Sequence, residues 1–174
     1  AEICSPYYAV PEKRLDALLS GRETVRIPES VHAGHDQLLA GLEAAEQMIA
    51  IIDERSRSIR DYGEAALAYF GQGPEAFERY QAADDAFSAL IPDWENWFEH
   101  MLVNHMFFVQ FPFQDRPVPL MDEYLSLCAV YALLRFLCLG WTAEHPTTEA
   151  AVDVCAAAFR LIDHTDFDRL AAPI

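Results

Sequence analysis

The stretch "YLSLCAVYALLRFLCLGW", residues 124–141, is the longest apolar run in the sequence and decides the expected fold. It contains Arg135 and is preceded by Asp122 and Glu123, and these charges make it a poor membrane span. We therefore expect a helix from about residue 119 to residue 140 that is buried in a protein core and ends at Gly140.

The rest of the chain contains many start and stop signals of helices, and signals of strands are nearly absent. A short helix is expected from Pro11 to near Gly21, and "RETVRIP", residues 22–28, is the one possible extended segment. The other helices are expected at about residues 31–55, 58–71, 74–90, 92–111 and 149–164. With 174 residues, the chain fits one domain, so we predict a single all-α bundle of about six or seven helices over 1–174.

Several boundaries follow from particular residues. Ser58, three residues before an acidic side chain, resembles a capping box, and Pro92 is placed to begin a helix that Pro112 ends. Thr147 or Thr148 can cap the last helix. In the helix at 31–55, apolar side chains recur at spacings of three and four, at Leu38, Leu39, Leu42, Ala45 or Met48, Ile49 and Ile52.

The composition restricts the possible partners. Twelve Lys+Arg against 28 Asp+Glu give a formal charge of −16, which repels the phosphates of nucleic acids. The basic residues are scattered, with one cluster at Arg55, Arg57 and Arg60, so an anionic membrane surface is not favoured either. The apolar fraction of 52% is slightly high, which favours a homodimer or a missing neighbouring domain.

The four cysteines are Cys4, Cys128, Cys138 and Cys155, and they form no CxxC pair. The last three stand in apolar helical runs, where thiols usually act as small core side chains, so we expect a reducing compartment and a cytoplasmic protein. Nucleophile motifs and phosphate-binding loops are absent, and the sequence identifies no catalytic residue.

The helix at 92–111 includes most of the stretch "MLVNHMFFVQFPFQ", residues 101–114, and carries the best candidate binding residues. One broad face holds large side chains, namely Trp94, Trp97, Phe98, Met101, Leu102, His105 and Phe108. Asn96, His100 and Asn104 form a polar line on its flank. This pattern is typical of a core face with a hydrated edge, or of a pocket wall that binds a small polar ligand or a peptide. In the second interpretation Trp94, Trp97, His100 and Asn104 bind the ligand or partner.

Arg135 is a further candidate, because an unpaired buried charge costs several kcal/mol. It must emerge at the helix surface, pair with a carboxylate from a neighbouring helix, or bind an anionic ligand. For metals, the best local pattern is His32, His35 and Asp36, at the start of a helix and without a second such cluster, so no metal site is expected.

Three stretches together resemble the C-terminal helical part of the flagellin lysine-N-methylase family. In "MLVNHMFFVQFPFQ" a helix that reads Leu-Val-Asn leads into a Phe-Pro-Phe turn, and "YLSLCAVYALLRFLCLG" at 124–140 forms the next apolar helix. "IIDERSRSIRDYGEAALAYFG" at 51–71 is weakly similar to the arginine-containing helix of that family. The resemblance implies a bacterial protein that methylates lysine side chains of flagellin or of another lysine-bearing protein.

In that family the chemistry is attached to a cysteine-rich region that precedes the helical part, with an iron–sulfur cluster and S-adenosylmethionine as the implied cofactors. This sequence lacks the cysteine cluster, so it would be the C-terminal part of a longer protein, without a cofactor of its own and not catalytic alone. The alternative is a non-enzymatic all-α ligand-binding or dimerisation module of a bacterial regulator.

Overall fold

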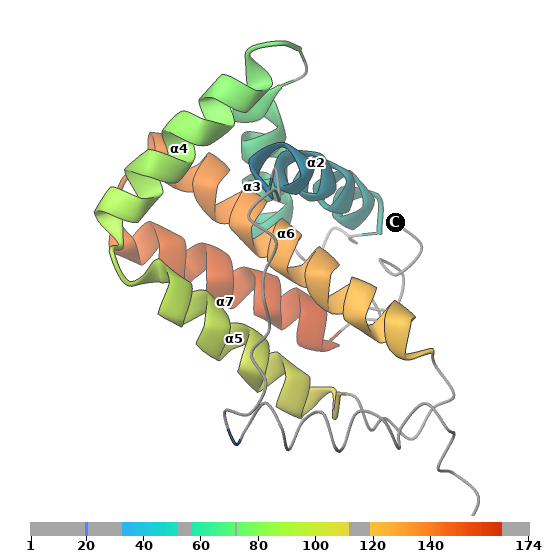
Figure 1. Ribbon diagram of the computed structural model, residues 1–174. Helices are drawn as coiled ribbons and strands as arrows, with labels where there is room; N and C mark the ends of the chain where they lie inside the picture. Colours follow the sequence, from blue (N-terminus) through green and yellow to red (C-terminus); the bar gives the residue numbers. More distant parts are fainter. Residues whose placement is uncertain (1–19, 21–32, 52–56, 72, 112–118, 165–174) are drawn as a thin grey trace, which may run out of the picture. The chain divides into compact units, whose positions relative to one another are not determined.

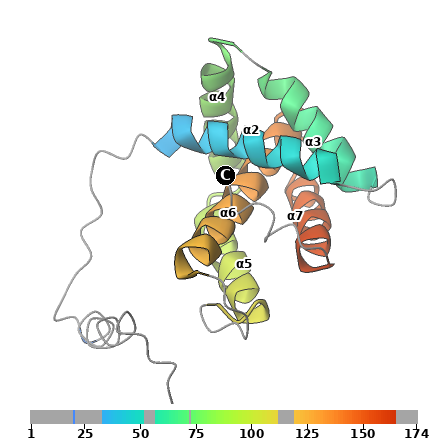
Figure 2. The same cartoon turned by 90° about the vertical axis from the view of Figure 1, so that its right-hand side faces the viewer.

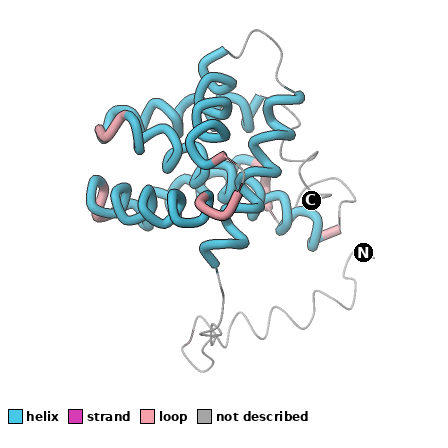
Figure 3. Tube along the Cα trace, turned by 90° about the horizontal axis from the view of Figure 1, so that it is seen from above, coloured by secondary structure: helices cyan, strands magenta, loops and turns pink. Residues whose placement is uncertain are grey.

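The computed structural model describes residues 20, 33–51, 57–71, 73–111 and 119–164. Ala33–Ile174 forms one compact unit, and Ala1–His32 belongs to a separate one. The described residues form six helices and no strand, which confirms the all-α prediction (Figures 1 and 3). Apart from residue 20, the expected helix from Pro11 and the possible extended segment at 22–28 lie outside the described residues, and a single domain over 1–174 stays a prediction.

The helices of this unit are arranged around α6, which contacts each of the other five. In Figures 1 and 2, α2, α3 and α4 lie on one side of α6, and α5 and α7 lie on the other. Their bounds are α2 Ala33–Ile51, α3 Arg57–Phe70, α4 Ala76–Leu90, α5 Trp94–Phe108, α6 Leu120–Glu144 and α7 Thr148–His164.

The apolar run that decided the expected fold is the centre of the core. Every residue from Ala132 to Gly140 is buried, and this confirms the prediction of a buried helix. By length and composition α6 could also cross a membrane, but 61% of its most apolar window is buried inside the protein. The core helix of a soluble protein passes the same test, so α6 is no evidence for or against a membrane location.

Gly140 does not end the helix, and this part of the prediction was wrong. It lies inside α6, where a Cβ atom would stand 2.5 Å from the Cβ of Ala66 and 2.6 Å from its Cα. The glycine is needed because α3 approaches α6 closely at this point, and the helix continues to Glu144. A glycine that permits close packing and one that stops a helix look alike in a sequence.

Two further expectations about helix ends were wrong. Ser58 does not cap α3, which already begins at Arg57, so Ser58 is an exposed residue within the helix. Helix α5 ends at Phe108 instead of running to residue 111, and the chain then turns through Gln110, whose φ is 59°. Pro112 lies outside the described residues.

Other local predictions were confirmed. Thr147 caps α7, because its Oγ1 accepts a hydrogen bond from the backbone N–H of Ala150 at 3.1 Å. In α2, Leu38, Ala45 and Met48 are buried as expected. Leu39 is half exposed, so the buried face of α2 is narrower than its apolar pattern suggests.

Candidate functional site

Arg135 lies at the centre of α6 and is paired with a carboxylate from a neighbouring helix. Its side chain is 3% exposed and donates a hydrogen bond from Nη2 to Oδ1 of Asp84, which belongs to α4. The guanidinium carbon also lies 3.5 Å from the ring centroid of Trp94, the first residue of α5. This arrangement confirms that a carboxylate from another helix compensates the buried charge.

Aromatic rings enclose the pair. The guanidinium carbon is 5.2 Å from the ring centroid of Phe87 and 5.8 Å from that of Phe98, while Phe87 and Phe98 pack edge to face at 6.3 Å. A guanidinium is attracted to the faces of aromatic rings, most strongly to tryptophan. Arg135 therefore joins α4, α5 and α6 by one ion pair and a set of ring contacts.

Burial shifts the ionisation of this cluster. It lowers the pKa of Arg135 to about 10, an effect that the nearby Tyr80 partly offsets. It raises the pKa of Tyr80 to about 12, against the opposing effect of the Arg135 charge. At neutral pH the arginine is therefore charged and the tyrosine is neutral. The Nη1 atom of Arg135 is buried without a hydrogen-bond partner, and binding of an anionic ligand by Arg135 stays a prediction.

A cavity of about 300 Å³ lies between α5 and α7. It is lined by Met101, Asn104, His105 and Phe108 of α5 and by Phe159 of α7. The His105 side chain is buried, and its ring centroid is 6.0 Å from that of Phe159. Apolar walls with a few polar groups are typical of pockets that bind small molecules or apolar side chains, and this volume is at the lower end of their range.

The structure separates the five candidate binding residues into different settings. Trp94 and Arg135 are in contact in the ion-pair cluster, whereas Asn104 lines the cavity. Trp97 is half-buried against the core, and His100 is exposed on the flank of α5. Ligand or partner binding by these residues stays a prediction.

The polar line on α5 was predicted correctly, and the apolar face only in part. Asn96, His100 and Asn104 are all exposed, and Phe98 and His105 are buried. However, Phe108 is 62% exposed and belongs to the cavity rim and not to the core. The C-terminal end of α5 is therefore more open than its sequence pattern indicates.

Sequence reasoning missed two residues. Asp84 is the partner of Arg135, and the signal that could have found it is its helical spacing from the buried Tyr80 and Phe87. Phe159 is the cavity-lining residue of α7. Its local sequence gave no sign of this role, because the role depends on how α5 and α7 are placed on α6.

The comparison with protein families is decisive for identity. The family of the FliB lysine N-methylase C-terminal domain matches residues 26–169, which include all six helices. The chain belongs to this family. It is therefore related to flagellin lysine N-methylase, as the resemblance implied. Comparisons with curated proteins and with solved structures gave no match.

The described cysteines of this FliB-type domain do not fit an iron–sulfur cluster. The Sγ atoms of Cys138 and Cys155 are 3.6 Å apart, but Cys128 is exposed ten residues before Cys138 on the same helix. Within the described ranges, no three His, Cys, Asp or Glu side chains are placed to hold a metal ion. His35 is exposed there, with its ring 5.6 Å from that of Phe77, and His32 lies outside these ranges.

Proposed function

We propose that this chain is the helical, non-catalytic domain of a bacterial protein-lysine N-methylase. Its role is to hold a lysine-bearing protein, flagellin by resemblance, for a catalytic part located elsewhere in the parent protein. The observation that carries this proposal is the family match over residues 26–169. The proposal places the protein in the cytoplasm and assigns S-adenosylmethionine and an iron–sulfur cluster to the catalytic part.

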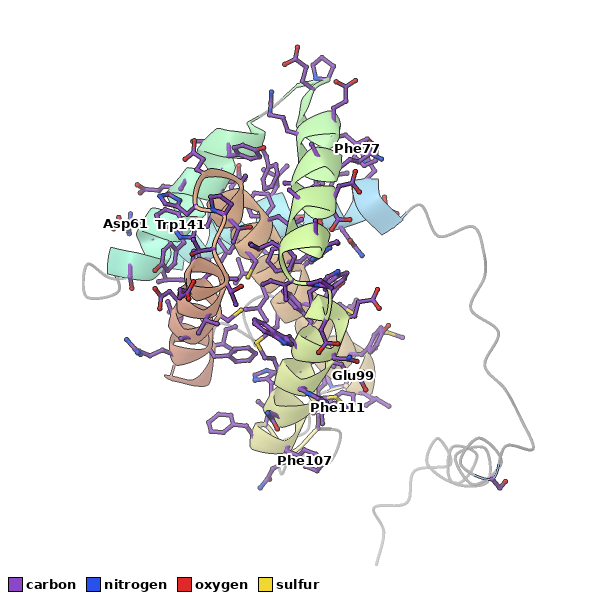
Figure 4. The ribbon with its side chains drawn as sticks, turned by 90° about the vertical axis from the view of Figure 1, so that its left-hand side faces the viewer. Asp61, Phe77, Glu99, Phe107, Phe111 and Trp141 are labelled. Atoms are coloured by element: carbon purple, nitrogen blue, oxygen red, sulfur yellow. The ribbon has the colours of Figure 1, made fainter. Side chains whose placement is uncertain are left out.

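The charge of the domain supports recruitment of a lysine-bearing partner. The formal charge is −16, and exposed carboxylates include Glu95 and Glu99 on α5; Figure 4 labels Glu99. A surface of this sign attracts lysine side chains and raises the rate of encounter, an effect that salt screens.

Exposed apolar side chains give a second means of contact. They gather at the C-terminal end of α5 and the N-terminal end of α6, and include Phe107, 78% exposed, and Met121, 64% exposed; Figure 4 labels Phe107 at the end of α5. Large apolar side chains that are exposed in such numbers are typical of surfaces that contact another protein. A partner that carries both lysines and apolar side chains could bind through both features.

Two measurements test the proposal. The full-length parent and this chain are incubated separately with flagellin and a methyl donor, and we expect methylation by the parent only. Methylation by neither protein would overturn the family-based assignment, and methylation by this chain alone would overturn its non-catalytic role.

The holding role is tested by binding of flagellin to this chain at increasing salt concentration. We expect affinity to fall with salt, and to fall further in the double variant Glu95→Lys and Glu99→Lys. The matched control is the double variant Glu95→Gln and Glu99→Gln, which should weaken binding less because it removes charge without reversing it. Equal affinity of all three proteins at low salt would contradict electrostatic recruitment through α5.

A second candidate function rests on the cavity between α5 and α7. A ligand-binding module would take a small molecule with an apolar body and one hydrogen-bonding group. The bound ligand would raise the melting temperature of the chain, and the Asn104→Ala variant would show a smaller rise. Asn96→Ala is the matched control, since Asn96 lies on the same polar line but does not line the cavity. No ligand-dependent shift across a broad metabolite panel would count against this function.

A further inference from the structure

Two thiols from different helices lie side by side in the core. The Sγ atoms of Cys138 on α6 and Cys155 on α7 are 3.6 Å apart, within hydrogen-bond distance for sulfur. Cys138 is fully buried, whereas Cys155 is partly accessible to solvent. The third described cysteine, Cys128, is exposed on α6 and provides a comparison within the same chain.

The hydrogen bond between the thiols makes them chemically different. It lowers the pKa of Cys155, while the same bond and complete burial raise the pKa of Cys138. The thiolate is the nucleophilic form of cysteine. Cys155 is therefore the reactive member of the pair, and it is also the less buried of the two residues.

We propose that Cys155 and Cys138 form an oxidation site that takes a hydroperoxide as its co-reactant and closes to a disulfide between α6 and α7. This inference is independent of the proposed function, since it rests only on the two thiols and their surroundings.

In the first step the Cys155 thiolate attacks the distal oxygen of the hydroperoxide. The O–O bond breaks, the leaving alkoxide or hydroxide takes up a proton, and Cys155 becomes a sulfenic acid. In the second step the sulfur of Cys138 loses its proton and attacks the Cys155 sulfur, the S–O bond breaks, and water leaves. Two thiols are oxidised by two electrons in total, and one hydroperoxide is reduced to an alcohol, or to water if it is hydrogen peroxide.

The short distance between the two sulfur atoms favours closure. A disulfide has an S–S distance of about 2.05 Å, so the 3.6 Å separation must shorten by roughly 1.5 Å. The hydrogen bond to Cys155 and burial raise the pKa of the Cys138 thiol, and the positive charge of Arg135, one helical turn before it, partly offsets this rise. Cys155 of α7 lies directly beside Cys138 of α6. Cys128 is ten residues from Cys138 along the same helix, so it is not the expected disulfide partner.

The test uses the full chain and mass spectrometry. The native protein is treated with hydrogen peroxide, quenched with catalase, denatured and alkylated. Of the four cysteines, two should lose their reactivity toward the alkylating agent, and reduction with dithiothreitol should restore it. Trypsin cleavage after Arg135 and Arg160 places both thiols in the peptide 136–160, which should be lighter by two hydrogens and unalkylated. Cleavage of that peptide after Glu144 should leave its two parts joined.

Variants separate the two steps. Cys155→Ser should leave Cys138 open to alkylation after peroxide treatment, and Cys138→Ser should trap the Cys155 sulfenic acid, which dimedone then labels. Cys128→Ser is the matched control and should leave the disulfide unchanged.

The wild-type peptide map decides the proposal even if a core variant fails to fold. If peroxide oxidises Cys128 while Cys138 and Cys155 stay open to alkylation, the proposal is wrong. It is also wrong if Cys155 pairs with another cysteine, or if the linked peptide forms only after denaturation.

Discussion

Replacement of Asp84 by alanine should destabilise the protein more than replacement of Arg135 by methionine, although Asp84 is the more exposed of the two. The Arg135 side chain is 3% exposed and that of Asp84 is 43% exposed. Asp84→Ala leaves a guanidinium buried without its carboxylate. Arg135→Met removes the buried charge, fills most of its volume, and leaves a carboxylate that water can reach.

The expected free energies of unfolding follow from this asymmetry. Breaking a fully buried ion pair by removing one partner costs about 3–5 kcal/mol. Because Asp84 is partly hydrated and the Trp94 ring still contacts the guanidinium, we expect a smaller loss of roughly 1–3 kcal/mol for Asp84→Ala. For Arg135→Met we expect a change of less than about 1.5 kcal/mol, as for swaps that conserve volume.

Urea unfolding followed by helical circular dichroism measures both changes. Asp85→Ala is the matched control, because Asp85 is the exposed neighbour of Asp84 on α4 and should change stability by no more than about 0.5 kcal/mol. A result in which Asp84→Ala is no worse than Asp85→Ala, or in which Arg135→Met costs more than Asp84→Ala, would refute the reasoning.

Variants at three further positions test the packing, capping and ionisation of the fold by the same unfolding measurement. Gly140→Ala should destabilise the protein by about 1–3 kcal/mol, because the new Cβ would meet the Ala66 backbone. This loss is expected although alanine is intrinsically more favourable than glycine in a helix by about 1 kcal/mol. A variant that is more stable than the wild type would contradict the close approach of α3 and α6. Thr147→Ala should cost about 1 kcal/mol and Thr147→Ser only a few tenths, and equal losses would argue against the cap on Ala150. Burial raises the pKa of Tyr80 from 10.0 to about 12. The stability that the neutral Tyr80 side chain contributes to the folded state is therefore fully present below pH 10 and is lost as pH rises through about 12. Tyr80→Phe should therefore lose less stability than the wild type between pH 10 and pH 12, by up to ~3 kcal/mol, and parallel pH curves would be evidence against this shift.

The helices could be predicted from sequence because their signals are local. The apolar period of α2, the threonine before α7 and the long apolar run of α6 each act within one or two helical turns. The charge of Arg135 also made a carboxylate from a neighbouring helix one of the expected partners. Which carboxylate it would be could not be predicted, because Asp84 and Arg135 meet only when α4 and α6 pack together.

The cavity could also be predicted only in part, because it too depends on how the helices pack together. Asn104 was predicted as a polar residue beside an aromatic face, and it lines the cavity. Phe108 follows the same apolar period as the buried Phe98, yet it is 62% exposed because the end of α5 is not covered within the described residues. Periodicity identifies the side of a helix that faces its neighbours, but not how far along the helix those neighbours extend.

Glycines explain why α2 and α3 pack tightly on α6. A Cβ at Gly41 of α2 would stand 2.6 Å from the Cβ of Phe136, and one at Gly140 would stand 2.5 Å from the Cβ of Ala66 on α3. Only glycine leaves room at such points for another side chain or backbone. Helices α2 and α3 are therefore fixed on α6 by contacts that permit little adjustment.

Helix α5 is held in a different way, and this explains where the cavity lies. It has no glycine and packs through large rings, with Phe98 5.9 Å from Tyr131 of α6 and Trp94 against Arg135. Large side chains at a helix contact increase the distance between the helix axes. Since α5 and α7 both pack on α6, space remains between them at His105 and Phe159. We therefore expect that a ligand or a partner side chain can enter this space by moving α5, while the close contacts of α2 and α3 with α6 stay as they are.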